Sequence, residues 1–207
     1  MAHYQLYSRA GTASMVVEAA LRLTGAGFQN HDVPDRNSQK QSAFLAINPA
    51  GKIPVLITPQ GQTIFESTAI LLVLDERHPE AKLLPPFGTN ERAIAVQWLA
   101  FMATSTYSAA LRYYYPEAFT TDNSDVAITA VKAAGASGMD RDFEILAAAL
   151  KNPYLLGETM TIADVYLAML ADWHEPAMEI AEMQRLKAEV LKSSAVRAAW
   201  GSHEFTA

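Results

Sequence analysis

The chain has 207 residues, half of them hydrophobic, and carries a formal net charge of −6. It contains no cysteine, which excludes disulfides and thiolate metal sites, so any nucleophilic sulfur must come from a ligand. The acidic balance argues against a nucleic-acid partner, and the lack of an apolar stretch of about 18 residues argues against a membrane span. No basic segment followed by an apolar run opens the chain, so we expect no secretory signal and a cytoplasmic location.

Residues 1–80 alternate short β-prone runs with segments of helical periodicity. The β-prone runs predict strands at residues 4–7, 28–33, 54–58 and 63–65. Apolar residues at helical spacing predict helices at residues 15–24, 42–47 and 67–78. The order β-α-β-α-β-β-α predicts an α/β domain with a four-stranded sheet and helices on its faces.

Residues 81–91 are a predicted linker, because they contain the stiff run Leu-Leu-Pro-Pro-Phe-Gly. No strand pattern follows, so residues 92–207 are predicted to form an all-α domain. Helices are predicted at residues 90–115, 125–150, 161–173, 177–191 and 194–200. Gly135 and Gly138 lie in the second of these, where we expect them to soften the middle of the helix.

The first run that could carry chemistry lies at residues 48–56 and reads Asn-Pro-Ala-Gly-Lys-Ile-Pro-Val-Leu. Pro54 opens a predicted strand, a position where its missing N–H costs nothing. One interpretation is an ordinary turn before an edge strand. The other is a cis bond before Pro54, which would turn the backbone N–H and C=O of Ile53 outward to pair with an extended peptide.

The second run lies at residues 65–70 and reads Phe-Glu-Ser-Thr-Ala-Ile, where a strand ends and a helix begins. Ser67 is placed as the helix N-cap, beside N–H groups that suit an anion. Glu66 supplies a negative charge next to them, so together they could hold both ends of an amino-acid zwitterion. The simpler interpretation is a plain N-cap with an acid near the helix dipole.

A third block reads Tyr-Leu-Leu-Gly at residues 154–157 and Thr-Ile-Ala-Asp at residues 161–164, where Thr161 and Asp164 form a capping-box variant. In this order, the three blocks resemble the cytosolic glutathione S-transferase family, in its bacterial type, over essentially the whole chain. The resemblance implies a thioredoxin-like first domain at about residues 1–80 and a helical second domain at about residues 92–207.

The resemblance also assigns a glutathione site. Ile53, ahead of a cis Pro54, would pair its backbone with the cysteinyl part of glutathione. Glu66 and Ser67 would hold the γ-glutamyl end, and Lys52 would reach the glycyl carboxylate. Asp164 would have a stabilising role. Glutathione is the implied co-substrate, and a homodimer is the implied assembly.

The group that activates the thiol should lie between the first strand and the first helix. The resemblance places Ala13 where some bacterial members of the family carry cysteine or asparagine, so this chain has no reactive side chain at that position. The hydroxyl candidates are therefore Ser14, which we favour, then Thr12 and Tyr7, with backbone N–H groups as the remaining alternative. Any of them would act by stabilising the thiolate.

A small apolar electrophile is expected against the helix after the linker. The candidate pocket residues are spaced so that their side chains could face one cleft; they are Phe101, Thr104, Tyr107 and Leu111. Burial in the helix core or at a dimer surface explains the same spacing at least equally well. The five histidines form no metal-ligand pair, so no metal is expected.

The implied function is conjugation of glutathione to the electrophile, a detoxification reaction. Two alternatives stay open. One is a non-catalytic glutathione-binding or regulatory member, which the unreactive Ala13 permits. The other is a different glutathione-dependent chemistry, namely peroxide reduction, ether cleavage or isomerisation. The substrate and the class within the family do not follow from the residues.

Overall fold

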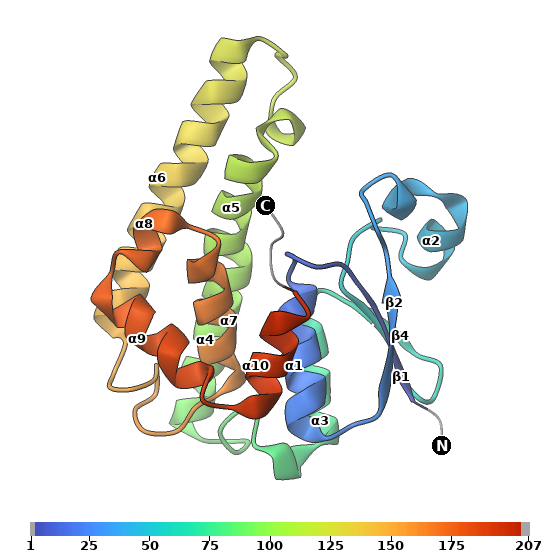
Figure 1. The fold of residues 1–207 in the computed structure, drawn as a ribbon, viewed down its shortest axis with the longest axis vertical. Helices are drawn as coiled ribbons and strands as arrows, with labels where there is room; N and C mark the ends of the chain where they lie inside the picture. Colours follow the sequence, from blue (N-terminus) through green and yellow to red (C-terminus); the bar gives the residue numbers. More distant parts are fainter. Residues whose placement is uncertain (1–2, 204–207) are drawn as a thin grey trace. The chain divides into compact units, whose positions relative to one another are not determined.

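Residues 3–203 are described by the computed structural model of this chain (Figure 1). Contacts between Cα atoms divide the chain into two units. The first unit comprises Met1–Pro86 together with the segment that starts at Val190, and the second comprises Phe87–Glu189. The first unit contains all strands of the described part of the chain, and the second is helical.

The sheet of the first unit has the strand order β2-β1-β3-β4. Strands β1 and β2 are parallel, whereas β3 is antiparallel to both β1 and β4. Side chains alternate along β1, where Tyr4, Leu6 and Ser8 are buried, as expected for a strand with one face on the core. The strands are β1 (Tyr4–Ser8), β2 (Phe28–Asp32), β3 (Val55–Ile57) and β4 (Thr63–Phe65).

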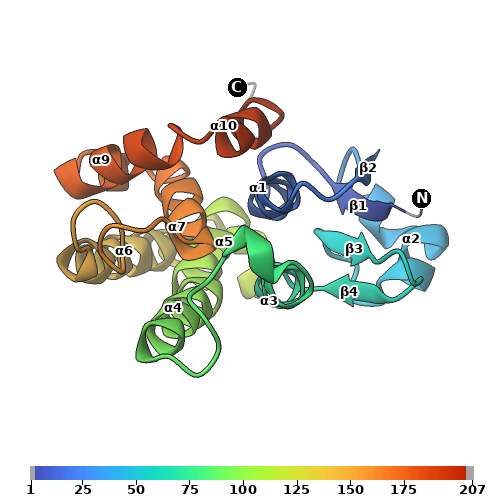
Figure 2. The ribbon, with the colours of Figure 1, turned by 90° about the horizontal axis from the view of Figure 1, so that it is seen from below.

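Helices cover both faces of this sheet, which confirms the predicted β-α-β-α-β-β-α order (Figure 2). Helices α1 (Ser14–Thr24) and α3 (Ser67–Arg77) lie on one face, and α2 (Ser42–Ile47) lies on the other. Helix α1 is buried from Ser14 to Leu21 and ends at Gly25, whose φ of 67° favours glycine.

Helix α10 (Ser194–Gly201) packs against α1, so it belongs to the first unit (Figures 1 and 2). It buries Val196 and Ala199 completely. The predicted second domain, residues 92–207, therefore differs from the contact-based division in the residues from Val190 to His203. The amphipathic pattern of α10 predicts a buried face, but it does not say which partner covers that face.

The second unit is built around α7 (Ile162–Asp172), which is buried from Ile162 to Ala171. A helix that is apolar on all sides needs neighbours all around it, and this one supplies the core of the unit. The other helices of this unit are α4 (Asn90–Phe101), α5 (Tyr107–Tyr114), α6 (Asp125–Ala149), α8 (Glu175–Met178) and α9 (Ala181–Val190).

Three details of this unit differ from the predictions. A π-helical turn, Met102–Thr106, interrupts the predicted helix at residues 90–115 between α4 and α5. The helix predicted at residues 177–191 is preceded by α8 and starts only at Ala181. Helix α6 continues unbroken through Gly135, where a Cβ would lie 2.8 Å from the carbonyl oxygen of Ala109. Gly135 therefore permits close packing of α5 on α6 rather than softening the helix.

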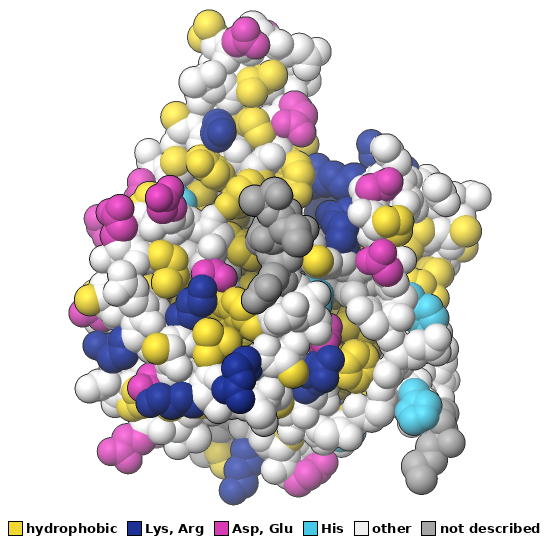
Figure 3. Space-filling model, viewed as in Figure 1, with side chains coloured by type: hydrophobic (Ala, Val, Ile, Leu, Met, Phe, Trp, Pro, Cys, Tyr) yellow, Lys and Arg dark blue, Asp and Glu magenta, His cyan; other side chains and the backbone are white. Residues whose placement is uncertain are grey.

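Acidic and basic side chains are interspersed over the face of the molecule shown in Figure 3. None of the helices within residues 3–203 has both the length and the apolar character that a membrane crossing requires.

Candidate functional site

Three loop segments of the first unit leave or enter the sheet at the same end. Tyr7 at the end of β1 pairs with Val55 at the start of β3, and Val55 also pairs with Phe65 at the end of β4. Because β3 runs antiparallel to both neighbours, the segments after β1, before β3 and after β4 must all lie at this end. The strand register thus brings together the candidate residues that the sequence carries in separate runs.

The segment before β3 contains a cis peptide bond between Ile53 and Pro54, as one of the two interpretations of this run predicts. The side chain of Ile53 packs against the apolar cluster of Val33, Phe44 and Val55. Within the described residues, the backbone N–H and C=O of Ile53 have no hydrogen-bond partner. These groups can accept an extended peptide in the manner of an added strand.

Asn48 holds this segment in shape, although it was not among the predicted site residues. Its side chain is fully buried. Its Nδ2 donates to the carbonyl oxygen of Lys52 at 2.7 Å, and its Oδ1 accepts from the Ala50 N–H at 3.0 Å. Its carbonyl accepts from the N–H of Gly51 at 2.9 Å. The Asn-Pro pair that opens the run was the available signal, because asparagine side chains commonly close such turns.

Glu66, and not Ser67, occupies the N-cap position of α3, which corrects the predicted cap. Ser67 is the first helical residue, and the Glu66 side chain makes no capping hydrogen bond. Glu66 has φ 70° and ψ 115°, a conformation that is strained for a residue with a side chain. Its carboxylate is left exposed beside the first N–H groups of the helix. The Glu66 carboxylate can accept hydrogen bonds from a ligand ammonium, and the adjacent N–H groups of the helix N-terminus can donate to a carboxylate of the same ligand.

Lys52 is exposed, and its ammonium has no ion-pair partner among residues 3–203. Only its backbone carbonyl is engaged, by Asn48. The side chain therefore remains available for a ligand carboxylate near Ile53, its neighbour in the chain.

The three hydroxyl candidates after β1 have different surroundings. Tyr7 is half-buried, stacks on His31 with ring centroids 4.8 Å apart and meets Phe44 edge-on at 6.2 Å. Ser14 is fully buried in the first turn of α1, whereas Thr12 is partly exposed. Of Thr12 and Ser14, Thr12 is thus the less buried residue.

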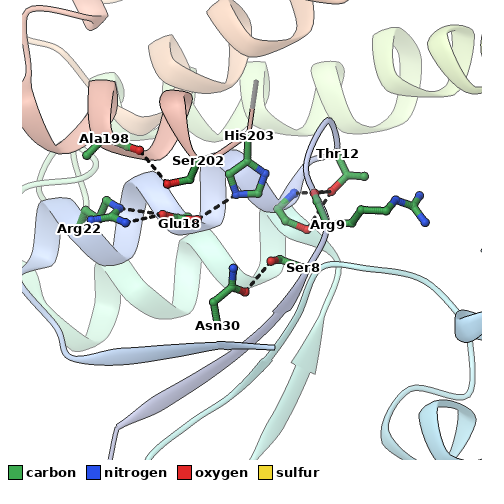
Figure 4. Close-up of polar contacts among 10 residues, drawn as sticks. Ser8, Arg9, Thr12, Glu18, Arg22, Asn30, Ala198, Ser202 and His203 are labelled. Atoms are coloured by element: carbon green, nitrogen blue, oxygen red, sulfur yellow. Dashed lines mark hydrogen bonds and ion pairs between the residues drawn. The ribbon is translucent and has the colours of Figure 1, made fainter. Parts of the chain in front are cut away.

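Hydrogen bonds orient the Thr12 hydroxyl (Figure 4). Thr12 Oγ1 donates to the carbonyl oxygen of Arg9 at 2.7 Å and lies 2.9 Å from Ser14 Oγ. Because Thr12 has a single hydroxyl proton, the proton between the two hydroxyls comes from Ser14 when Thr12 bonds Arg9. Ser14 therefore supports Thr12, and the Thr12 hydroxyl can donate its hydrogen bond to another acceptor that replaces the Arg9 carbonyl.

The four pocket candidates lie in the second unit, on and beside the π-helical turn. Phe101, Tyr107 and Leu111 are half-buried, and Thr104 is exposed. The neighbouring Met102 and Thr106 face the core instead, with at most 1% exposure. The candidates therefore share the less buried side of this helical segment.

Three of the four candidates have contacts that can be named. Phe101 meets Trp98 edge-on at 5.8 Å, and Tyr107 meets Trp173 at 5.9 Å. The hydroxyl of Thr104 donates to the carbonyl of Ala100 at 2.8 Å. The Thr104 hydroxyl is therefore engaged with its own helix, and Phe101 and Leu111 supply apolar side chains on the same segment.

Asp164 acts in the capping box predicted for α7. Its Oδ2 accepts from the Thr161 N–H at 2.7 Å and from the Thr161 hydroxyl at 2.8 Å, and its Oδ1 accepts from the Leu155 N–H at 2.7 Å. Burial raises the pKa of the Asp164 carboxyl, and these hydrogen bonds offset the rise only in part. Its role is structural, since it is fully buried in the second unit.

Residues 3–203 hold no group of three or more histidine, aspartate or glutamate side chains placed to bind a metal ion.

Two family models match this chain: the glutathione S-transferase N-terminal domain over residues 12–77 and the glutathione S-transferase C-terminal domain over residues 102–188. A similar protein is glutathione S-transferase GstA of Escherichia coli O157:H7, which is 25% identical over 82% of this chain and 81% of its own length. The maleylacetoacetate isomerase of Pseudomonas aeruginosa is 37% identical, over 41% of this chain and 42% of that protein.

Solved structures agree with this assignment. A sphingomonad glutathione S-transferase, complexed with glutathione, matches 96% of this chain and 98% of its own with a TM-score of 0.77 at 29% identity. The two family models together span most of both units, and an α/β first unit with a helical second unit is what the resemblance implied. The chain therefore belongs to the glutathione S-transferase family and is a member of bacterial type.

Proposed function

We propose that this protein binds glutathione at the sheet end described above, stabilises its thiolate and transfers it to a small apolar electrophile. The observation that supports this most directly is the strand register. It places the backbone of Ile53, the carboxylate of Glu66 and the loop of Thr12 around one end of the sheet. A γ-glutamyl tripeptide with a central thiol presents an extended backbone, a zwitterion and a sulfur, which are the groups that these elements can receive.

In this proposal each binding residue has one task. The backbone of Ile53 pairs with the cysteinyl residue of glutathione, next to the cis Pro54. Glu66 receives the γ-glutamyl ammonium, and Ser67 with the first turn of α3 receives the neighbouring carboxylate. Lys52 receives the glycyl carboxylate. The glutathione in the sphingomonad relative supports this choice of ligand.

The thiol requires activation, because a free cysteine thiol with a pKa near 8.5 is largely protonated at neutral pH. We assign this role to Thr12 and not to Ser14, which the sequence favoured, because Thr12 is partly exposed and Ser14 is fully buried. The Thr12 hydroxyl would donate a hydrogen bond to the thiolate sulfur while keeping its proton, the thiol proton would pass to solvent, and the Ser14 hydroxyl would donate a hydrogen bond to Thr12 Oγ1. Each unit by which the thiol pKa falls corresponds to about 1.4 kcal/mol of stabilisation.

The electrophile is assigned to the less buried side of the segment from Phe101 to Leu111, where these two half-buried apolar side chains lie. The thiolate would attack the electrophilic carbon, a carbon–sulfur bond would form, and the leaving group would depart with its electron pair. The rate gain would come from positioning and from thiolate stabilisation. A homodimer in the cytoplasm remains part of this proposal on the strength of family membership.

The test combines binding with turnover. Glu66→Ala with Ser67→Ala should abolish glutathione binding in calorimetry, whereas Glu76→Ala, an exposed glutamate near the other end of α3, should bind as the wild type does. Thr12→Val should lower turnover of a chloro-aromatic substrate about tenfold, with Thr12→Ser close to wild type. Unchanged binding in the double variant would refute the binding site. A loss of turnover in Ser14→Ala but not in Thr12→Val would transfer the role to Ser14.

A glutathione-dependent isomerase is the second candidate, favoured by the 37% identity to maleylacetoacetate isomerase over 90 residues. The same site would then add the thiolate to an activated double bond and release it after rotation, so glutathione would be regenerated. Turnover of a cis-enedione without consumption of glutathione would select this chemistry over conjugation. Glutathione binding with no turnover of chloro-aromatics, peroxides or enediones would instead indicate a binding module.

A further inference from the structure

Glu18 and His203 form a buried hydrogen-bonded pair inside the first unit, and no step of the proposed function uses it. His203 Nε2 lies 2.9 Å from Glu18 Oε2, and the two side chains are 4% and 3% exposed. A carboxylate oxygen only accepts, so the Nε2 of His203 carries the proton. The other carboxylate oxygen of Glu18, Oε1, accepts a hydrogen bond of 2.8 Å from Arg22 Nε, and the Arg22 side chain is partly exposed at the surface.

His203 also contacts the loop of the proposed thiol-activating residue. Its carbonyl oxygen accepts from the Gly11 N–H at 3.3 Å. Gly11 immediately precedes Thr12 and has a φ of 68°, a turn conformation that favours glycine. Figure 4 shows His203 between Glu18 on α1 and the loop that carries Thr12. One residue thus connects the helix that follows the loop with the loop itself.

The contact lies close to the proposed reacting group. Thr12 is oriented by the Arg9 carbonyl and by Ser14, and the Met15 N–H bonds the Thr12 carbonyl at 3.1 Å. These contacts stay within the loop and the first turn of α1. Through its bond to Gly11, His203 brings a segment distant in sequence to the backbone next to Thr12. A shift of the Gly11 backbone would move the Thr12 hydroxyl away from its acceptor, and small misplacements of this kind reduce catalysis strongly.

We propose that His203 is a positioning residue for the thiol-activating loop. Glu18 fixes the His203 ring, and the His203 carbonyl fixes Gly11, so the segment after α10 determines where the Thr12 hydroxyl points. This inference rests on the proposed function, because it presumes that the loop of Thr12 stabilises a thiolate. It predicts an effect on the bound thiol that is separate from any effect on protein stability.

The experiment compares His203→Asn with His203→Gln in the full chain. The Gln amide is long enough to donate to Glu18, whereas the Asn amide is one methylene shorter. His78→Ala serves as a control, since His78 hydrogen-bonds Tyr4 at 3.1 Å in the same unit without contacting the loop. The readouts are the pKa of enzyme-bound glutathione, titrated by its thiolate absorbance, together with kcat, the glutathione Kd and the melting temperature.

His203→Asn should decrease the thiolate fraction of bound glutathione and lower kcat, each about fivefold, while the glutathione Kd changes less than about twofold. His203→Gln should retain wild-type values. His78→Ala should lower the melting temperature and leave the thiol pKa unchanged. A wild-type thiol pKa and kcat in His203→Asn would overturn the inference, as would equal losses in the Asn and Gln variants.

The wild-type measurement separates this inference from the proposed function. If the wild-type protein binds no glutathione, or binds it without lowering its thiol pKa, the proposed function itself fails. If the wild type lowers the thiol pKa and His203→Asn lowers it equally, only the role of His203 is refuted.

Discussion

Glu18 in the first unit and Asp164 in the second are both buried carboxylates, but their partners differ in kind. Glu18 meets two side chains that can carry positive charge, His203 and Arg22. Asp164 accepts only from neutral donors, the N–H and hydroxyl of Thr161 and the N–H of Leu155. The partners of Asp164 lie within nine residues of it, whereas His203 is 185 residues from Glu18.

The difference in partners reverses the effect on the pKa. Burial by itself raises the pKa of Glu18, but hydrogen bonds and charge from His203 and Arg22 outweigh it, so the pKa falls below its ordinary value. For Asp164, burial dominates and the pKa lies above its ordinary value. A buried carboxylate thus keeps its charge easily where cations face it, and at a cost where only neutral donors do.

The largest effect on stability is expected at Asp164. Asp164→Ala would leave three buried donors without an acceptor, which should lower the free energy of unfolding by about 4 kcal/mol. Asp164→Asn keeps one acceptor oxygen and should lose about half as much. Urea denaturation measures both values, and equal losses in the two variants would show that the hydrogen bonds do not determine the stability of the capping box.

The next effect is a pH dependence of opposite sign at the two sites. Glu18→Gln should cost about 2 kcal/mol at pH 7. The pKa of Glu18 is lower in the folded protein than its ordinary value of 4.5. The charged carboxylate therefore stabilises the fold fully above pH 4.5, and this stabilisation is lost as the pH falls through the folded pKa. The stability gap between wild type and Glu18→Gln should therefore narrow in acid.

Asp164 should behave in the reverse manner. Its folded pKa is raised, so the folded protein binds a proton more tightly than the unfolded chain and gains stability as the pH falls through that pKa. The difference in the free energy of unfolding between wild type and Asp164→Asn should therefore widen as the pH falls toward 3.8, the ordinary pKa of an aspartate. Urea denaturation at a series of pH values measures both gaps, and parallel trends would contradict the contrast in partners.

The smallest effect is expected at Arg22, the outer partner of Glu18. Its side chain is 35% exposed, and the pair spans one helical turn of α1, so Arg22→Ala should cost only about 0.5 kcal/mol. Arg22→Lys should be nearly neutral. A loss in Arg22→Ala as large as that in Glu18→Gln would assign the stabilisation of Glu18 to Arg22 rather than to His203.

Much of the fold and the site was predictable because it depends on short-range contacts. Periodicity predicted the order of strands and helices, and the run at residues 48–56 indicated the turn before Pro54. The capping box of Thr161 and Asp164 spans three residues and was predicted as it is observed. The Ser67 cap was predicted wrongly, because the pattern of a serine before a helix cannot show that Glu66 adopts a positive φ one residue earlier.

The sequence by itself determined the two units' classes, the turn before Pro54 and the family, since these depend on local patterns that survive in any packing. The tertiary structure alone decided that Ser14 is buried while Thr12 is accessible, and that α10 packs against α1. It alone decided that Glu18 meets His203. The physical reason is that a hydrophobic face or a buried charged group is stable only with a partner that covers or pairs with it. The sequence pattern indicates this need, but the packing of the whole chain decides which residue is the partner.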